Sequence, residues 1–196
     1  MSTGNIHAKS NCSSAFEIAL GSAWFDLPPS IQCLHKTFAP KQIQGQFKVS
    51  HGQNWVSKWI ARLLRLPKPS SAVDVTLVIE RQDFKEIWTR RFGNAVLKTT
   101  LWCNRGYLIE RFGCMEFCFQ AENSAQTVIY KQSHCALSIG CCSLKLPKWI
   151  APVVCGTECA SPVANCVEVM TSISLPAAGL LLSYRGLAFG SNSPLL

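Results

Sequence analysis

Two short stretches of the chain combine charged and aromatic residues in a similar pattern. "EIWTRRFG" covers residues 86–93 and "LIERFG" covers residues 108–113, so their Arg-Phe-Gly endings lie twenty residues apart. Alternate side chains of a strand share a face. We therefore expect one face of the first stretch, and one face of the second, to carry a mixed aromatic and charged set: Glu86, Trp88, Arg90 and Phe92, then Leu108, Glu110 and Phe112.

This pattern predicts a binding surface if the aromatic face lies inside the protein. Three charged residues would then face the interior too, and a buried charge is costly unless it is paired. Two carboxylates can share one guanidinium group, because Arg binds bidentately. Pockets are mostly apolar with a few placed polar groups. We therefore predict a small apolar or amphipathic ligand and these ligand-binding residues: Glu86, Trp88, Arg90, Phe92, Glu110 and Phe112. In the alternative, the charges form ordinary cross-strand pairs on a solvent face.

Catalytic chemistry has weaker support in the sequence. Glu86 or Glu110 could serve as acid or base in a small hydrolase or isomerase, but neither stands in a diagnostic motif. A Cys–His enzyme using Cys135 or Cys142 is a further alternative, although the chain has no nucleophile elbow and no glycine-rich phosphate loop. The interpretation favoured here is a non-enzymatic binding domain without a cofactor.

The eleven cysteines include no Cys-x-x-Cys pair. Cys155, Cys159 and Cys166 could bind zinc with His134 only if a loop brought them together. Residues four apart in a strand are roughly 13 Å from each other, too far to share one ion. An odd cysteine count without an export signal argues against a disulfide framework. We expect reduced, mostly buried cysteines and no metal.

Composition predicts a folded cytoplasmic protein. The apolar fraction is 48% and the charged fraction is 15%. The net charge of +8 is scattered without long basic runs, so nucleic-acid binding is not favoured. Residues 1–14 are polar and lack the apolar stretch of an export signal. They are interpreted as a loose leader, residues 15–190 as one domain, and residues 191–196 as a tail.

Hydrophobic periodicity predicts an α+β fold, mainly β. The helical pattern of residues 16–36 is divided by Pro28 and Pro29, and a strand is expected over residues 41–50. From Val73 onward, short alternating segments predict antiparallel strands, with residues 146–152 as a loop. The expected architecture is a strongly curved antiparallel sheet or incomplete barrel of about seven to nine strands, with two or three packed helices.

A second helix is predicted over residues 54–66, with an apolar half and a basic half. We expect Trp55 and Trp59 to be covered by strands and the basic side chains of Lys58, Arg62 and Arg65 to face solvent. In the alternative, the apolar half of this helix docks on a dehydrogenase or lies on an anionic membrane surface.

Several phrases occur in an order that resembles the bacterial domain of unknown function 4166 family over roughly residues 18–189. They are "LGSAWFDLPPSIQCLHK", "IQGQFKVSHG", "EIWTRRFG", "LIERFG", "LPKWIAP" and "LPAAGLLLSYRGLAF". The chain departs from the pattern in its cysteine content and in the Leu that follows Tyr184-Arg185-Gly186. The resemblance implies a fold and a family but no activity. Because members are sometimes joined to a dehydrogenase-like nucleotide-binding domain, it also implies a dehydrogenase-like partner protein.

Overall fold

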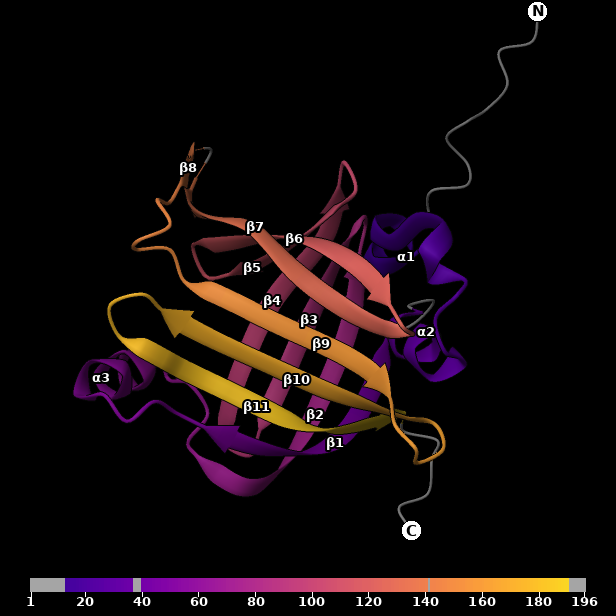
Figure 1. The fold of residues 1–196 in the computed structure, drawn as a ribbon, viewed down its shortest axis with the longest axis horizontal. Coiled ribbons are helices and arrows are strands. Elements are labelled where there is room, and N and C mark those ends of the chain that lie inside the picture. The colour runs from indigo at the N-terminus through magenta and orange to yellow at the C-terminus, as the bar shows by residue number, and fades with distance from the viewer. Residues whose placement is uncertain (1–12, 37–39, 141, 191–196) are drawn as a thin grey trace, which may run out of the picture.

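The computed structural model describes residues 13–36, 40–140 and 142–190, so the predicted leader up to residue 12 and the tail from residue 191 lie outside the described residues. Eleven strands are found there, all in one antiparallel sheet (Figure 1). The strands are β1 (Lys41–Ser50), β2 (Ser70–Gln82), β3 (Lys85–Phe92), β4 (Ala95–Asn104), β5 (Tyr107–Phe112), β6 (Met115–Ser124), β7 (Thr127–Ile139), β8 (Cys142–Lys145), β9 (Val153–Ala160), β10 (Cys166–Leu175) and β11 (Gly179–Gly190). The helices are α1 (Ala15–Leu20), the 3-10 helix η1 (Gly21–Trp24), α2 (Pro29–His35) and α3 (Trp55–Leu63).

The sheet closes on itself. Its strand order is β6-β5-β4-β3-β2-β1-β11-β10-β9-β7-β8, and β6 also pairs with β7. That pairing joins ten strands into a closed barrel and leaves β8 outside as an extra strand on β7. The prediction of a mainly β antiparallel fold with packed helices is confirmed. The prediction of an incomplete sheet of seven to nine strands is wrong, because every strand of the ring has two neighbours.

Sequence analysis missed two strands, the short β8 and β9, and β9 joins β10 to β7 and so completes the ring. Its inward positions are Val154, Gly156 and Glu158, whereas Cys155 and Val153 are exposed. A glycine and a glutamate at inward positions break the apolar alternation that identifies a half-buried strand. Tertiary pairing on both sides nevertheless holds the segment extended.

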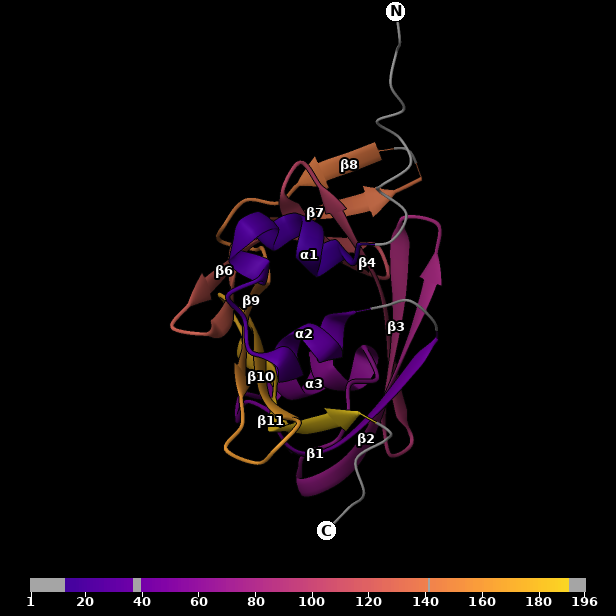
Figure 2. The ribbon, with the colours of Figure 1, turned by 90° about the vertical axis from the view of Figure 1, so that its right-hand side faces the viewer.

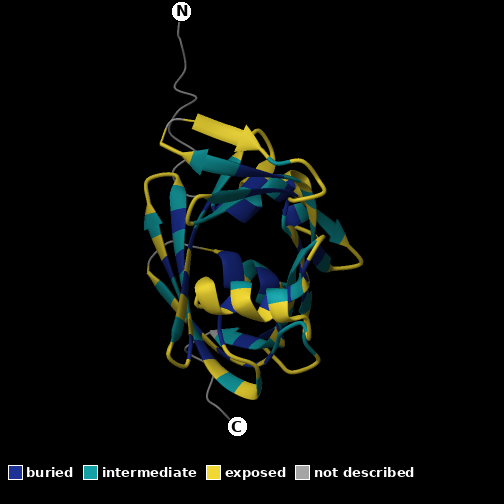
Figure 3. Cartoon of the chain, turned by 90° about the vertical axis from the view of Figure 1, so that its left-hand side faces the viewer, coloured by how far each residue is buried: buried dark blue, intermediate teal, exposed yellow. Residues whose placement is uncertain are grey.

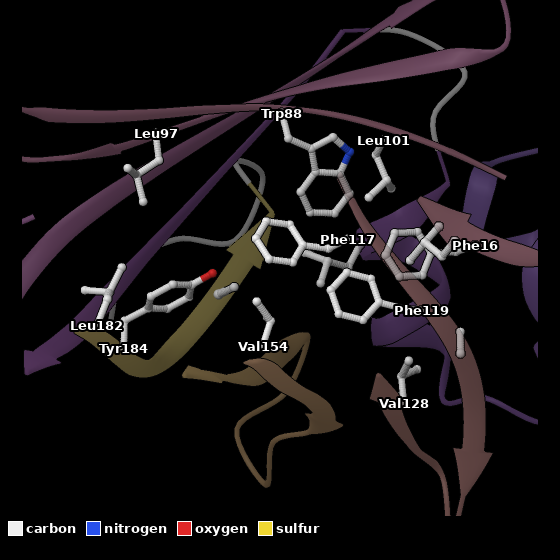
Figure 4. Packing of buried hydrophobic residues seen from close by; sticks show 14 of the residues in the cluster. Phe16, Trp88, Leu97, Leu101, Phe117, Phe119, Val128, Val154, Leu182 and Tyr184 are labelled. Carbon is white, nitrogen blue, oxygen red and sulfur yellow. The ribbon is translucent and has the colours of Figure 1, made fainter. Parts of the chain in front are cut away.

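The clearest alternation of buried and exposed residues in the barrel wall is in β1. In β1, at the position predicted for a strand, the buried residues are Ile43, Gly45, Phe47 and Val49. The ring of Phe47 fills the space over two glycines of neighbouring strands. A Cβ atom at Gly45 would come within 2.6 Å of that ring, and one at Gly186 within 2.7 Å. Figure 4 shows the aromatic and aliphatic side chains that fill the interior, including Trp88, Phe117, Phe119 and Tyr184.

The N-terminal helices lie at one end of the barrel (Figure 2). The Ser14 side chain accepts a hydrogen bond from the Glu17 backbone N–H and so caps α1. Pro29 stands in the first turn of α2, as the division at Pro28 and Pro29 predicted. Phe16 and Ile31 are buried, which places the apolar faces of α1 and α2 against the barrel core.

Helix α3 lies at the opposite end of the barrel and presents its large side chains to solvent. Asn54 caps it by accepting a hydrogen bond from the Val56 backbone N–H. The prediction that the tryptophans are covered is wrong, because Trp55 is 77% exposed and Trp59 is 61% exposed. The buried positions are Ser57 and Ala61 instead. These small residues let the helix backbone pack closely, and exposed residues cover the outer side of the helix (Figure 3).

Nine cysteines lie within the described residues and none of these nine forms a disulfide. Only Cys118, Cys135 and Cys166 are buried, so the prediction that most cysteines are buried is wrong for this part of the chain. Cys12 and Cys141 lie outside the described residues. Residues 13–36, 40–140 and 142–190 contain no group of three or more His, Cys, Asp or Glu side chains placed to bind a metal ion. Within the same ranges, no helix is both long and apolar enough to cross a membrane.

Candidate functional site

A cavity of about 100 Å³ lies inside the barrel. Most of its wall is apolar and comes from facing strands, with rings such as Phe47, Trp88, Phe92 and Phe119. A small set of polar side chains also reaches the cavity: Arg90, Glu110, Tyr130, Glu158, Thr171 and Tyr184. An apolar wall with few polar groups is the composition of a small-molecule site.

The first polar group is an ion pair between Arg90 on β3 and Glu110 on β5. Arg90 Nη1 donates to Glu110 Oε1 (3.1 Å) and to Thr99 Oγ1 (2.9 Å) on the intervening strand β4. The guanidinium also lies over the Trp88 ring, 5.0 Å from its centroid. The two charged side chains are 16% and 22% exposed. Because both line the cavity, that remaining surface is within reach of a ligand.

The second polar group lies across the interior and joins α2 to β9. His35 Nε2 and Glu158 Oε2 are 2.5 Å apart, and these side chains are 0% and 8% exposed. The His35 ring stacks on Phe16 of α1, with centroids 3.6 Å apart. The Tyr130 hydroxyl of β7 is close enough to Glu158 to affect the pKa of its carboxyl, but no partner for it meets hydrogen-bond geometry among the described residues.

Electrostatics fix the charge of these groups. Burial alone would raise the pKa of Glu158, but the charge of His35, the hydrogen bond from His35, the nearby Tyr130 hydroxyl and the charge of Arg90 together lower it. Burial opposes the charge of Arg90, yet Glu110 and the other anionic groups raise its pKa. Burial raises the pKa of Tyr184, and burial with the nearby Glu158 raises the pKa of Tyr130 well above its usual value. Both phenols therefore stay protonated and can donate hydrogen bonds.

Glu86 has a structural position rather than a place in the cavity wall. Its Oε1 accepts from the backbone N–H of Ala15 at the start of α1 (2.9 Å), and its Oε2 accepts from Trp88 Nε1 (3.0 Å). The carboxylate thus ties the N-terminal helix to β3. The prediction that Glu86 and Glu110 share Arg90 is wrong. The hydrogen bonds of Arg90 go to Glu110 and Thr99.

Of the six residues predicted from sequence, four line the cavity and two do not. Trp88, Arg90, Phe92 and Glu110 belong to the wall. Phe112 packs against the core away from the cavity lining, as does the buried Glu86. Arg90 and Glu110 lie on the same face of the sheet, because they form a direct ion pair.

Sequence reasoning missed the second polar group altogether. His35 ends a helix, Tyr130 stands in an ordinary alternating strand, and Glu158 stands in β9, which was not predicted. Only one local signal was available, the Val154-x-Gly156-x-Glu158 alternation. Barrel closure is what brings these three residues together.

Comparison with known proteins gives a family and no activity. No curated protein matches the chain. A crystal structure of a protein of unknown function from the DUF3598 family of Nostoc punctiforme PCC 73102 has a TM-score of 0.42 and 11% identity. The match covers 76% of this chain and 46% of that protein, and we draw nothing from a likeness at this level. A family model described as domain of unknown function (DUF4166) matches residues 27–187, as the quoted phrases predicted. The chain therefore belongs to the DUF4166 family.

Proposed function

We propose that the protein binds a small amphipathic ligand inside the barrel, without catalysing a reaction on it. The observation that carries this proposal is the cavity of about 100 Å³, whose apolar wall is interrupted by Arg90, Tyr130 and Tyr184. Pockets for drug-sized ligands measure roughly 300–1,000 Å³. The ligand is accordingly a small molecule, with its apolar part against rings such as Phe47.

The polar groups of the cavity indicate what the ligand carries at its polar end. Glu158 is held by His35, and Glu110 is held by Arg90. The Tyr130 hydroxyl is buried and has no partner that meets hydrogen-bond geometry within the described residues, and an unsatisfied buried hydroxyl costs about 1–3 kcal/mol. A ligand oxygen that accepts from Tyr130 removes this cost. The ligand class that fits is a small carbonyl, carboxylic acid or alcohol with an apolar tail.

Binding has better support here than the hydrolase or isomerase alternative. Both oxygens of Glu86 hold backbone and indole donors, so this carboxylate is used to anchor α1. Glu158 has a lowered pKa, whereas a general acid working near neutral pH needs a raised one. The cytoplasmic location and the dehydrogenase-like partner stay predictions.

A pair of variants on β2 tests the proposal. Leu77 lines the cavity, whereas its neighbour Val78 lies on the outer face of the same strand. Native mass spectrometry and thermal-shift assays with short-chain ketones, carboxylic acids and alcohols measure binding. We expect Leu77→Phe to lower affinity by about tenfold or more, while Val78→Phe binds as the wild type does.

The Tyr130→Phe variant tests the polar end separately. It should weaken binding of oxygen-bearing compounds, because the buried hydroxyl that they would bind is gone. Any fall in melting temperature measures what the hydroxyl contributes to the nearby Glu158 carboxylate. Unchanged binding by Leu77→Phe would show that these compounds do not enter the cavity, and would contradict the proposal.

A further inference from the structure

Large apolar side chains are exposed at the α3 end of the barrel. Trp55, Trp59 and Leu63 follow each other at intervals of four residues, so they form one stripe along the helix. This stripe faces away from Ser57 and Ala61, which hold the helix to the barrel. A stripe of this kind in water is unfavourable unless something covers it.

A second exposed apolar group lies at the same end of the barrel. Leu144 of β8 and Trp149 of the segment between β8 and β9 are exposed, Trp149 by 73%. Figure 1 shows that segment and α3 at the same end of the barrel.

Strand register places the two groups near each other. The backbone N–H of Gly52, just before α3, donates to the Leu180 carbonyl at the start of β11 (3.1 Å). Leu180 pairs with Ser174 of β10, and Ser174 pairs with Val153 at the start of β9. Neighbouring strands are about 4.8 Å apart. The attachment points of α3 and of the Trp149 segment are therefore separated by three such spacings, roughly 15 Å across the sheet.

The charged residues of the two connecting segments at this end of the barrel are all positively charged. Residues 51–69 contain Lys58, Arg62, Arg65 and Lys68, residues 139–153 contain Lys145 and Lys148, and neither range contains Asp or Glu. On the nearby strands, Asp74 is exposed and Glu116 is bound by Arg111. Each segment that carries an exposed tryptophan thus also carries basic residues and no acidic ones.

A groove beside α3 collects several of these cations. It has a volume of about 950 Å³ and is lined by Lys58, Arg62, Arg65 and Lys68. Its apolar lining includes Phe92 and Val73. Cationic walls with an apolar base suit an anionic lipid, whose headgroup meets the charges while its acyl part meets the apolar surface.

We propose that the α3 end of the barrel docks on an anionic phospholipid surface, with Trp55, Trp59 and Trp149 at the interface. Trp is favoured at membrane interfaces because its ring is apolar with one polar edge. Amphipathic helices with Lys and Arg beside Trp and Leu lie in the plane of such surfaces. Anionic lipids attract the surrounding basic residues. This docking is independent of whether the cavity binds a ligand.

Vesicle flotation tests the docking directly. The probe is a set of phosphatidylcholine vesicles with or without about a third phosphatidylglycerol, a content at which basic residues bind by surface charge. We expect binding to the anionic vesicles, weakened but still present in about 1 M salt, where the Debye length is about 3 Å. Trp59→Ala with Trp149→Ala should lower affinity about tenfold or more. Phe84→Ala is the matched control, because Phe84 is equally exposed at the opposite end.

Quenching by brominated lipids reports which tryptophans enter the interface. The six tryptophans include Trp24 and Trp88, which are buried, and Trp102, which lies near the opposite end. Replacing Trp55, Trp59 and Trp149 by Phe should therefore abolish quenching while the other three still fluoresce. Circular dichroism confirms that each variant is folded.

Three outcomes would overturn the docking proposal. One is the absence of binding to anionic vesicles at low salt. Another is an affinity of the Trp59→Ala, Trp149→Ala variant equal to that of the wild type, which would show that binding comes from surface charge without the tryptophans. The third is displacement by inorganic phosphate at constant ionic strength, which would show that the groove takes a free anion.

Discussion

Arg90 and Glu110 show how two distant residues become one group. They stand twenty positions apart on β3 and β5, and Arg90 reaches across β4 to form the pair. Both side chains are largely buried, so neither has bulk water to replace its partner. Removing one member of a buried pair leaves an uncompensated charge, which costs more than the pair itself contributes.

The Arg90→Ala variant is therefore expected to lower the free energy of unfolding by about 3 kcal/mol, measured by urea denaturation. The control is Arg91→Ala on the same strand, because Arg91 is exposed on the outer face. Replacing both partners, as Arg90→Met with Glu110→Gln, should recover most of the loss. If Arg90→Ala were as stable as the wild type, water in the cavity would be solvating the unpaired Glu110 carboxylate.

Glu158 gives a prediction for pH. Its folded pKa is lowered from the usual 4.5, so the unfolded state takes up protons first as pH falls. The stabilisation by Glu158 is present above about pH 4.5 and is lost as pH drops through the lowered folded pKa. His35, Tyr130 and Arg90 face this carboxylate. Melting temperatures measured from pH 7 to pH 3 should fall less steeply for Glu158→Gln than for the wild type. The exposed-residue control Glu80→Gln should keep the wild-type slope.

At the scale of elements, β1 and β11 depend on two glycines that make room for one ring. The Phe47 ring lies where side chains at Gly45 and Gly186 would stand. The glycine in Tyr184-Arg185-Gly186 thus has a packing role, since a Cβ there would also come within 2.1 Å of the Gln46 carbonyl oxygen. A backbone atom cannot move aside as a flexible side chain can.

We expect Gly186→Ala to destabilise the protein by about 1–3 kcal/mol or more through this overlap, as measured by urea denaturation. Ser183→Ala provides a comparison on the outer face of the same strand and should change stability little. Equal stability of both variants would mean that β1 and β11 separate slightly at no cost.

At the scale of the whole molecule, closure removes the edges that an incomplete sheet would have. β6 pairs with both β5 and β7, so its backbone groups are satisfied on two sides. Only β8 lies outside the ring within the described residues, and all four of its residues are exposed.

Hydrogen exchange distinguishes the closed barrel from an open sheet. Amides of β6 and β7 should exchange as slowly as those of β2 and β3, whereas amides of β8 should exchange fastest among the strands. Early exchange along the β6–β7 junction, seen by mass spectrometry of peptides, would indicate that the ring opens there.

The sequence by itself determined the local features of this protein. Period-two alternation identified most strands and placed Glu86, Trp88, Arg90 and Phe92 on one face, because side-chain direction along a strand is a local property. The pair Pro28 and Pro29 located the start of α2, because the effect of proline on the backbone is also local. The phrase order identified the family.

Tertiary structure alone decided the remaining features. Whether β6 meets β7 depends on the accumulated twist and stagger of the sheet, which no single segment encodes. Closure then brought His35 and Glu158 together across 123 positions. The outward direction of Trp55 and Trp59 was also decided there, because the close contact available to Ser57 and Ala61 outweighed the larger apolar face. Periodicity shows that a helix has two faces, but only the surface it meets selects which one is buried.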